Sequence, residues 1–474
     1  MPSVSLRWGP PDGRFWNPPV QTLSPDELRR LQLERLGHAL ERIWTRPIPF
    51  FRRKLEAAHL TPADIRSLAD LAAIPVTVKD ELRASEREVP PFGDYRGARL
   101  EDCVRVGAST GTSGRPTYIL WTRRDLEVDD EAACRGRYRW GLRAGMSCAH
   151  AHPFGLYGGG WHFSHGLEAL GVLNVPLGPP ATAAQVDDAV EVWRRVRPAE
   201  VRLFGNAAAK FSEGARRRGL DPARDLGLTV AGEDPRAQYR TVSAGLEALG
   251  MLGTACAEAD GAHVCEDLAI VEILDRRTRR PVGDGERGVL VITTLEKDNL
   301  MLRYDLEDVV RTNYRPCPCG ETHVRLFWEG RAKDIVPVAG RELLPIDVAL
   351  ALATVPDLTG TVPEYQIVRR RADDGRLHLR VELTPVAQET GFRGAVERVV
   401  RERLGVATDL RVVPPGTLPR FDFKAARVVD AQPCAALSRS RPPAALALPA
   451  PRSGGSSPRS CAGSCRRRRP SAGI

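Results

Sequence analysis

Apolar residues in the N-terminal region recur with the period of a helix. Residues 24–60 begin with Ser24, Glu27 follows three positions later, and the apolar positions after them keep helical spacing. A serine followed three residues later by a glutamate is the capping box that begins many helices. We therefore predict a helical N-terminal region that starts at Ser24.

The middle of the chain alternates between two hydrophobic patterns. Residues 183–196 have helical spacing, whereas 200–205 and 226–232 are short apolar runs. This alternation predicts βαβ units and largely parallel sheets. Two further runs, 268–274 and 288–295, flank a polar turn region and predict a β-hairpin, so we expect the sheets to be mixed.

A smaller α+β pattern follows a boundary near residue 332. It predicts helices near 346–354 and 393–404, and strands near 364–370 and 377–384. The predicted fold class is α/β, with a large N-terminal domain of mixed and parallel sheets flanked by helices and a smaller, mobile α+β C-terminal domain. The expected boundaries are 1–331 for the large domain, 332–430 for the small lid domain and 431–474 for a disordered tail.

Length and composition agree with this division. A chain of 474 residues exceeds what one hydrophobic core usually supports. No run approaches the roughly 18 apolar residues of a membrane span, and the N-terminus lacks a signal peptide, so we expect a cytoplasmic protein that does not bind membranes. The ten cysteines are scattered, which favours reduced thiols or metal ligands over disulfides.

The net charge of +9 is concentrated in the C-terminal tail. Residues 431–474 contain eight arginines and no acidic residue, so the rest of the chain is nearly neutral. The tail is rich in Pro, Ala, Ser and Arg and has no periodic apolar face, which predicts disorder. Its Arg466–Arg469 run is read as a solvated tail or a basic contact patch. Because the arginines are not interleaved with aromatic residues, we expect no nucleic acid partner.

Residues 108–118, ASTGTSGRPTY, place four hydroxyl side chains and two glycines before Arg115 and Pro116. Glycines let backbone amides and hydroxyls converge on one oxyanion, which predicts that the stretch binds phosphate. The spacing is not that of a Walker A loop, because Gly111 and Gly114 are three apart and Arg115 precedes a proline. The stretch is therefore either a different phosphate loop or a surface turn.

Several later stretches follow this loop in a distinctive order. They are PFGLYGGG at 153–160, VAGEDP at 230–235, LRYDLEDVV at 302–310, GRAKD at 330–334 and GTLPRFDFKAARVVD at 416–430. In this order the chain resembles the adenylate-forming enzymes, specifically their phenylacetate-CoA ligase-like branch. The resemblance covers roughly residues 22–430.

The resemblance implies a site residue by residue. Asp308 would hold the ribose hydroxyls of ATP, although Asp305, Glu307 and Asp308 could equally form a solvated acidic turn. The pocket candidates, each of which could instead be a core residue, are Phe154, Tyr157, Trp161, Phe204 and Asn206. The implied roles are ATP binding by Ser109, Thr110, Gly111, Thr112, Ser113, Gly114, Arg115, Gly232, Glu233 and Asp308, acyl binding by Phe154, Tyr157, Gly158 and Phe204, a hinge at Lys333, and catalysis by Lys424 and Arg331.

The chemistry implied by the resemblance is a ligase reaction in two steps. A small, aromatic carboxylic acid attacks the α-phosphate of ATP, and coenzyme A then displaces AMP. Lys424 supplies a point charge for the first step, although by itself it would be a solvated lysine. A carrier-protein thiol or an amine remains an alternative acceptor. A homodimer is compatible with the resemblance.

Two cysteine-containing stretches raise the question of a metal. Some members of the branch carry a structural zinc bound by a Cys, a later His and a Cys-x-Cys, which correspond here to Cys256, His263, Cys317 and Cys319. A closed zinc site needs four such ligands. The alternative is a set of free cysteines. Cys265 would be a bystander.

One motif of the family is incomplete. The family places an aromatic-Gly-x-Thr-Glu segment after the Gly-Glu-Pro stretch, and its glutamate helps to hold Mg²⁺. The corresponding residues 239–261 are about a dozen residues too short against that pattern, and LGTA at 252–255 resembles a remnant. Glu258 would either take the place of the missing glutamate or be a solvated surface residue. An adenylation-deficient nucleotide-binding paralogue is therefore the rival hypothesis.

Overall fold

The computed structural model describes most of the chain. Residues 1–431 form one compact unit, and the tail for which disorder was predicted lies outside the described residues. No helix in the described part combines the length and the apolarity that a bilayer crossing requires. The described residues are 6–46, 48–109, 116–203, 207–228, 239, 241–242, 249–355, 362–370, 372–383, 389–419 and 426–431.

The N-terminal region is helical, as predicted, and its main helix is α2, Pro25–Thr45. The capping box is confirmed, because the Ser24 amide donates to the Glu27 carboxylate at 2.9 Å and the Glu27 amide donates to Ser24 Oγ at 3.4 Å. Leu36 and Leu40 are fully buried, one turn apart on the inner face of the helix. The other helices of this region are α1 (Pro18–Gln21), α3 (Pro49–Ala57), α4 (Lys79–Glu88), η1 (Pro62–Asp64), η2 (Leu68–Ala73) and η3 (Leu100–Asp102).

A three-stranded parallel sheet carries the predicted βαβ pattern, and helix α7 has the predicted bounds, Ala183–Val196. The strand predicted at 226–232 is wrong at its start, where α9, Pro222–Leu226, ends. The Asp221 side chain caps that helix and Gly227 ends it in the left-handed conformation, whereas the apolar pattern alone reveals neither signal. The remaining elements are β3 (Ser147–His150), β4 (Leu173–Pro176), β5 (Glu200–Arg202), α6 (Gly159–Ala169) and α8 (Ala207–Arg217).

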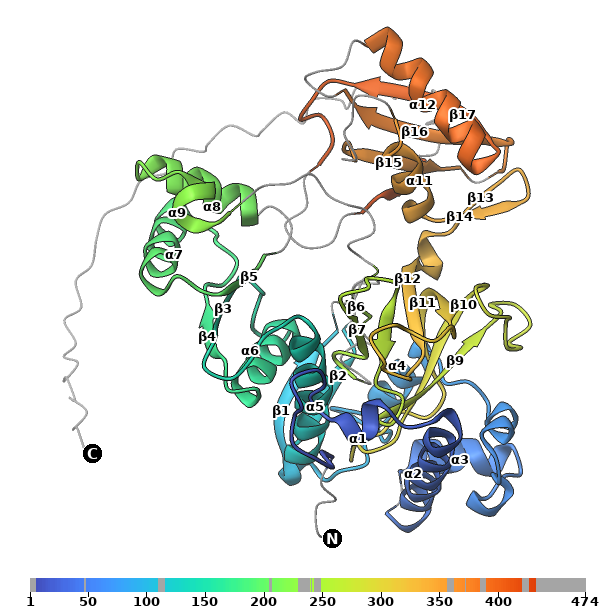
Figure 1. Ribbon diagram of the computed structural model, residues 1–474. Helices are drawn as coiled ribbons and strands as arrows, with labels where there is room; N and C mark the ends of the chain where they lie inside the picture. Colours follow the sequence, from blue (N-terminus) through green and yellow to red (C-terminus); the bar gives the residue numbers. More distant parts are fainter. Residues whose placement is uncertain are drawn as a thin grey trace, which may run out of the picture. The chain divides into compact units, whose positions relative to one another are not determined.

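The largest sheet has seven strands in the order β6-β7-β8-β12-β11-β10-β9 (Figure 1). The predicted hairpin is confirmed, because β9 (Ala269–Leu274) pairs antiparallel with β10 (Arg287–Thr294). The described pairings in this sheet are all antiparallel, so in the middle of the chain the predicted parallel arrangement holds for the three-stranded sheet but not for this one. Strands β9 to β12 follow one another without the crossover helices that parallel pairing needs. The other strands are β6 (Thr241–Val242), β7 (Gly253–Ala255), β8 (Ala262–Val264), β11 (Tyr304–Asn313) and β12 (Arg325–Arg331).

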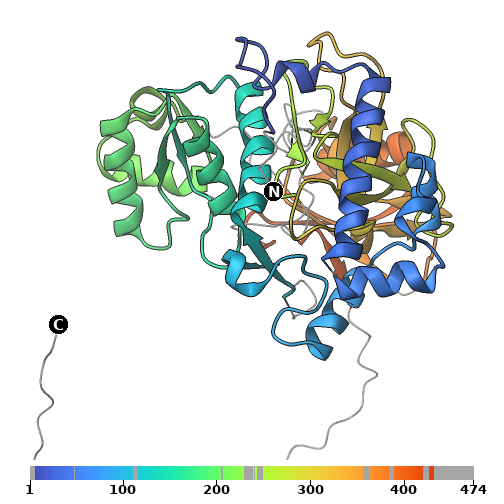
Figure 2. The ribbon, with the colours of Figure 1, turned by 90° about the horizontal axis from the view of Figure 1, so that it is seen from below.

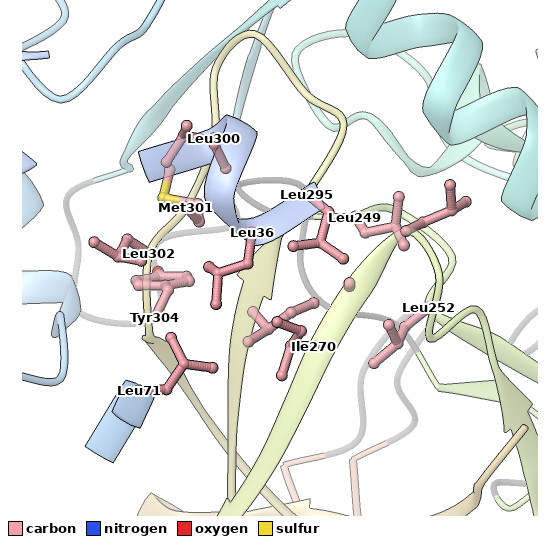
Figure 3. Close-up of a cluster of buried hydrophobic side chains, with 14 of the residues drawn as sticks. Leu36, Leu71, Leu249, Leu252, Ile270, Leu295, Leu300, Met301, Leu302 and Tyr304 are labelled. Atoms are coloured by element: carbon pink, nitrogen blue, oxygen red, sulfur yellow. The ribbon is translucent and has the colours of Figure 1, made fainter. Parts of the chain in front are cut away.

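Helix α5, Arg123–Arg139, connects the sheets, because it packs on α6 and also on β7 (Figure 2). It follows a separate antiparallel pair, β1 (Cys103–Ala108) and β2 (Tyr118–Thr122). The main core joins side chains of the N-terminal helices to those of the seven-stranded sheet, including Leu36 and Tyr304 (Figure 3). Full burial of one such aliphatic side chain contributes about 1.5–3 kcal/mol.

The C-terminal residues build an α+β arrangement with a core of its own. A four-stranded sheet, in the order β17-β16-β15-β18, is covered by two helices. The predicted elements are confirmed as α11 (Pro345–Leu352), α12 (Glu389–Leu404), β15 (Tyr365–Arg369) and β16 (Arg376–Glu382). The remaining elements are η5 (Ala332–Asp334), β13 (Val336–Val338), β14 (Arg341–Leu343), β17 (Ala407–Val413) and β18 (Val428–Asp430).

Candidate functional site

The predicted phosphate loop is the turn of the β1–β2 hairpin. Residues 110–115, which carry Thr110 to Arg115, lie outside the described residues, but both ends of the loop are described. Ala108 pairs with Tyr118, the Ser109 amide donates to the Thr117 carbonyl at 2.9 Å, and the Thr117 amide donates to Ser109 Oγ at 2.9 Å. The Ser109 hydroxyl therefore helps to hold the two ends of the loop together. That Ser109 binds phosphate stays a prediction.

The predicted acyl-pocket turn lies directly beside this hairpin. The turn leads into α6, and the Leu156 carbonyl within it accepts the Ala108 amide at 2.8 Å. The Phe154 and Trp161 rings meet edge to face at 5.2 Å between centroids. Two loops that are about 50 residues apart in sequence are thus joined through one backbone hydrogen bond. Gly158 caps the start of α6, and Phe204 and Asn206 lie outside the described residues.

Two buried histidines next to this turn are uncharged, and one of them, His150, contacts Phe154. His152 stacks on Phe163 with ring centroids 4.0 Å apart, and His150 contacts His152 at 5.1 Å. Burial lowers the pKa of His150 to about 4, and burial together with His150 lowers the pKa of His152 to about 2. Both imidazoles are therefore neutral at physiological pH, which suits an uncharged acyl group.

Strand pairing brings Asp308 and Arg331 together. They are register partners on β11 and β12, and Arg331 Nε lies 3.8 Å from Asp308 Oδ1. Burial raises the pKa of Tyr157, and the positive charge of Arg331 opposes the rise, which places Arg331 near the acyl-pocket turn. Asp308 and Arg331, to which the resemblance assigns ribose binding and catalysis, thus lie side by side, within electrostatic reach of Tyr157 of the acyl-pocket turn.

The predicted hinge residue Lys333 follows at once, in the short helix η5. Its side chain is exposed, and its carbonyl accepts a 2.6 Å hydrogen bond from Arg369 at the end of β15. The side chain of a pivot residue must tolerate a large backbone rotation, which an exposed lysine does.

The remaining ATP-site and catalytic predictions lie outside the described residues: Gly232, Glu233 and Lys424. The flanks of Lys424 are nevertheless anchored on the C-terminal sheet. The buried Glu382 carboxylate accepts the Gly416 amide at 3.1 Å and the Leu418 amide at 2.6 Å, and Val428 of β18 pairs with Ile367 of β15. The sequence analysis missed Glu382, because a charged residue at the end of a strand is usually solvated.

The remnant LGTA has a structural role. Thr254 lies in β7, is fully buried, and its hydroxyl accepts from Arg139 Nη1 at 3.0 Å. Arg139 also forms a buried ion pair with Glu321. Because Thr254 is fully buried, it has no exposed surface in this structure with which to contact phosphate. Glu258 is exposed in the turn before β8, which agrees with the solvated alternative.

The four predicted metal ligands form one cluster. The Sγ atoms of Cys256, Cys317 and Cys319 and a ring nitrogen of His263 lie within 4.8 Å of one another. Cys256 Sγ is 3.7 Å from Cys317 Sγ, and Cys319 Sγ is 3.3 Å from His263 Nε2. Cys265 lies outside this cluster and is fully buried, as a bystander would be.

The cluster fits a tetrahedral zinc ion by its chemistry. His263 Nδ1 lies 3.1 Å from the His323 carbonyl, which fixes the proton on Nδ1 and leaves Nε2 free to bind a metal. The hydrogen bond between Cys256 and Cys319 lowers the pKa of the Cys256 thiol and raises that of Cys319, so the two thiols share one proton between them. Three thiolates and one imidazole, with no open position, are the donor set of a structural site.

Comparison with known proteins agrees with the family resemblance of the sequence. Residues 340–432 match the family model described as the AMP-binding enzyme C-terminal domain. The phenylacetate-coenzyme A ligase of Thermus thermophilus is 33% identical over an alignment of 456 residues that covers 88% of this chain and 99% of that protein. The phenylacetate-coenzyme A ligase of Aromatoleum evansii is 29% identical over 441 residues, 88% of this chain and 97% of that protein.

A solved structure gives the same answer for the fold. The crystal structure of 2-hydroxyisobutyryl-CoA ligase, in the postadenylation state with 2-HIB-AMP, superposes with a TM-score of 0.79 at 29% identity. The match covers 90% of this chain and 94% of that one. From its relatives, its fold and its C-terminal domain, this chain belongs to the phenylacetate-CoA ligase family of adenylate-forming enzymes and is an AMP-forming acyl-CoA ligase.

Proposed function

We propose that this ligase activates a small, aromatic carboxylic acid with ATP and transfers the acyl group to coenzyme A. The observation that carries the proposal is the junction at which the Leu156 carbonyl accepts the Ala108 amide, because it joins the acyl-pocket turn to the phosphate loop. In the first step, a carboxylate oxygen attacks the α-phosphorus and pyrophosphate leaves. In the second step, the thiolate of coenzyme A attacks the acyl carbon and AMP leaves.

The proposed roles follow from charge and position. The hydroxyls and amides of residues 109–115 bind the β- and γ-phosphates, with Arg115 adding a positive charge. Asp308 accepts from the ribose hydroxyls, and Arg331, its strand partner, contacts ribose or phosphate. Gly232 and Glu233 form part of the adenine site, and Lys424 neutralises charge on the α-phosphate and the carboxylate.

The aromatic character of the substrate is supported by the acyl-pocket turn. Phe154 and Trp161 meet edge to face in and beside it, and the neutral His152 stacks on Phe163. The structural neighbour that acts on 2-hydroxyisobutyrate makes a small aliphatic hydroxy acid the competing substrate class.

We further propose that the reaction uses two arrangements of the chain, a large domain at 1–331 and a lid domain at 332–430 that turn about Lys333. Support comes from the separate C-terminal core, which includes Ile367, Leu379 and Val396, and from the exposed pivot. Turning a domain that has its own core leaves that core intact.

Mg²⁺ is proposed as the counter-ion of ATP, held mainly by the phosphates themselves. With Thr254 bonded to Arg139 and Glu258 exposed, neither residue replaces the missing motif. This observation favours the adenylation-deficient paralogue as the second candidate function.

The deciding experiment is pyrophosphate release from ATP and Mg²⁺ with a panel of acids. The panel contains phenylacetate, benzoate and 2-hydroxyisobutyrate, each with and without coenzyme A. We expect release that depends on an aromatic acid and increases with coenzyme A. Release with 2-hydroxyisobutyrate alone would contradict the aromatic substrate. ATP binding without any release would establish the deficient paralogue. Acyl transfer to an amine or a carrier-protein thiol, but not to coenzyme A, would contradict coenzyme A as the acceptor.

We also propose a structural zinc ion held by Cys256, His263, Cys317 and Cys319, which would tie the turn after β11 to β7 and β8. The purified protein is then expected to contain about one equivalent of zinc, and Cys317→Ala to retain less than about half of it and unfold at a lower temperature. Elemental analysis and thermal unfolding measure both effects. Cys103→Ser, which lies outside the cluster, is the matched control. A metal-free wild type would reject the site.

A further inference from the structure

Asp129, in the middle of α5, is a buried carboxylate with an unusual number of donors. It is 3% exposed and accepts from Lys297 Nζ at 2.8 Å, from the Trp121 indole at 3.0 Å and from the Gly250 amide at 3.4 Å. His162 Nδ1 lies 3.5 Å from the same carboxylate. Lys297 is 2% exposed, so the ion pair is shielded from water.

Each of these donors comes from a different element of the proposed active site. Trp121 lies in β2, directly after the phosphate loop, and His162 lies in α6, directly after the acyl-pocket turn. Gly250 lies in the shortened segment, just before β7. Lys297 lies in the connection that leads to β11, the strand of Asp308. One carboxylate therefore touches all four elements.

The shortened segment fits closely against this group. A Cβ atom on Gly250 would lie 2.9 Å from His162 Cγ, so only glycine allows the backbone to pass this ring. Burial lowers the pKa of His162 to about 4, with Asp129 opposing the shift, so the ring is neutral. The Gly250 amide is thus held between an imidazole face and the Asp129 carboxylate.

The connection that carries Lys297 has further anchors on α5. The Asp298 amide donates to Asp125 Oδ1 at 2.7 Å, and the Thr122 hydroxyl donates to Asp298 at 2.8 Å. Asn299 Nδ2 donates to Asp125 at 2.8 Å. This connection therefore keeps its place without Lys297, and loss of Asp129 acts mainly on Gly250 and Trp121.

A buried ion pair is by itself weak evidence for stability, because desolvation offsets the attraction, and an apolar pair of similar size is often as stable. Because the donors come from separate elements, the carboxylate fixes the positions of these elements relative to one another. We propose that Asp129 is a positioning residue for adenylation, which fixes the shortened segment at Gly250 relative to the phosphate loop and the acyl-pocket turn. This inference rests on the proposed function.

Two double variants separate positioning from charge. Asp129→Leu with Lys297→Met removes both charges and every acceptor, whereas Asp129→Asn with Lys297→Met removes both charges and keeps one acceptor oxygen. The asparagine variant is expected to unfold near the wild-type temperature, whereas the leucine variant, which leaves the Trp121 and Gly250 donors unpaired, should unfold at a lower temperature but remain folded under assay conditions. The leucine variant should lower kcat for acid-dependent pyrophosphate release by about 10- to 100-fold with KM for ATP little changed. The asparagine variant should recover most of that loss.

Hydrogen exchange gives a readout that does not need activity. In the full-length leucine variant, amides of the peptide around 249–255 should exchange faster than in the asparagine variant, while those of α2 stay unchanged. The control replaces the Lys54–Glu81 pair by methionine and leucine, because that pair joins α3 to α4 and contains no residue assigned to the site.

The outcomes are distinct. Equal kcat and equal exchange in the two variants would overturn the positioning role. An equal fall in kcat in both variants would mean that the charge of Asp129 matters and not its hydrogen bonds. That result would also overturn the positioning role. If the wild type releases no pyrophosphate, the proposed function fails, and the exchange difference alone then decides whether Asp129 holds the segment.

Discussion

Lys424→Ala is expected to lower acid-dependent pyrophosphate release by about 10²- to 10³-fold, because it removes the charge that balances the α-phosphate and the carboxylate as the first step proceeds. The second half-reaction, from a synthetic acyl-adenylate and coenzyme A, should continue at a comparable rate. The measurement is a pair of assays, one for each half-reaction, on the same preparation.

The anchors on both sides of Lys424 explain why the effect should be confined to chemistry. Glu382 holds the chain at Gly416 and Leu418, and β18 holds it again from Val428. Removing the lysine amino group leaves these backbone bonds in place. The thermal unfolding temperature of the variant should therefore match that of the wild type.

Two further variants make the result decisive. Lys424→Arg keeps a positive charge on a planar, longer group and should restore only part of the rate. Lys79→Ala, at the start of α4, removes a lysine that has no assigned role in the proposed site and should leave the rate unchanged. Wild-type adenylation in Lys424→Ala would refute the catalytic assignment, whereas loss of both half-reactions would indicate a broader role.

Asp267→Asn is expected to lower the free energy of unfolding by about 3–5 kcal/mol, because it breaks a fully buried ion network. Asp267 accepts from Arg135 at 2.5 and 3.0 Å and from Arg35 at 3.4 Å. Arg135 also donates to Glu131 at 2.9 Å. The network joins α2 to α5 and to the chain after β8. Urea unfolding of the full-length protein measures the loss.

The same network predicts a direction for the pH dependence. Burial would raise the pKa of Asp267, but the attraction of Arg135 and its hydrogen bonds outweigh burial and hold the pKa well below its usual range. The stabilisation is therefore present above the unfolded-state pKa of about 3.9 and is lost as the pH falls through the lower folded-state value. The difference in the free energy of unfolding between the wild type and Asp267→Asn should therefore become smaller below about pH 4.

An exposed pair serves as the control for this stability effect. Asp26 pairs with Arg29 at 3.0 Å, with side chains 89% and 66% exposed. Because solvent screens such a pair, Asp26→Asn should change stability by less than about 1 kcal/mol. A loss at Asp267 no larger than the loss at Asp26 would contradict the account of the buried network.

Local sequence signals were sufficient for much of the fold. The capping box at Ser24 marks the start of α2, the helical spacing of residues 183–196 matches α7, and the paired apolar runs predict the β9–β10 hairpin. Each of these depends on residues close together in the chain. Where a neighbouring cap changed the outcome, as Asp221 did for α9, the apolar pattern alone was wrong.

The order of motifs along the chain determined the family, and four scattered residues indicated a metal cluster that the fold brings within 4.8 Å. Neither required a structure, because motif order and ligand type are properties of the sequence. Only the tertiary structure decided that Asp308 and Arg331 are strand partners, that Thr254 is bonded to Arg139, and that Asp129 meets donors from four elements. These contacts join residues far apart in the chain, and strand register and helix packing, which depend on the whole core, set which of them meet.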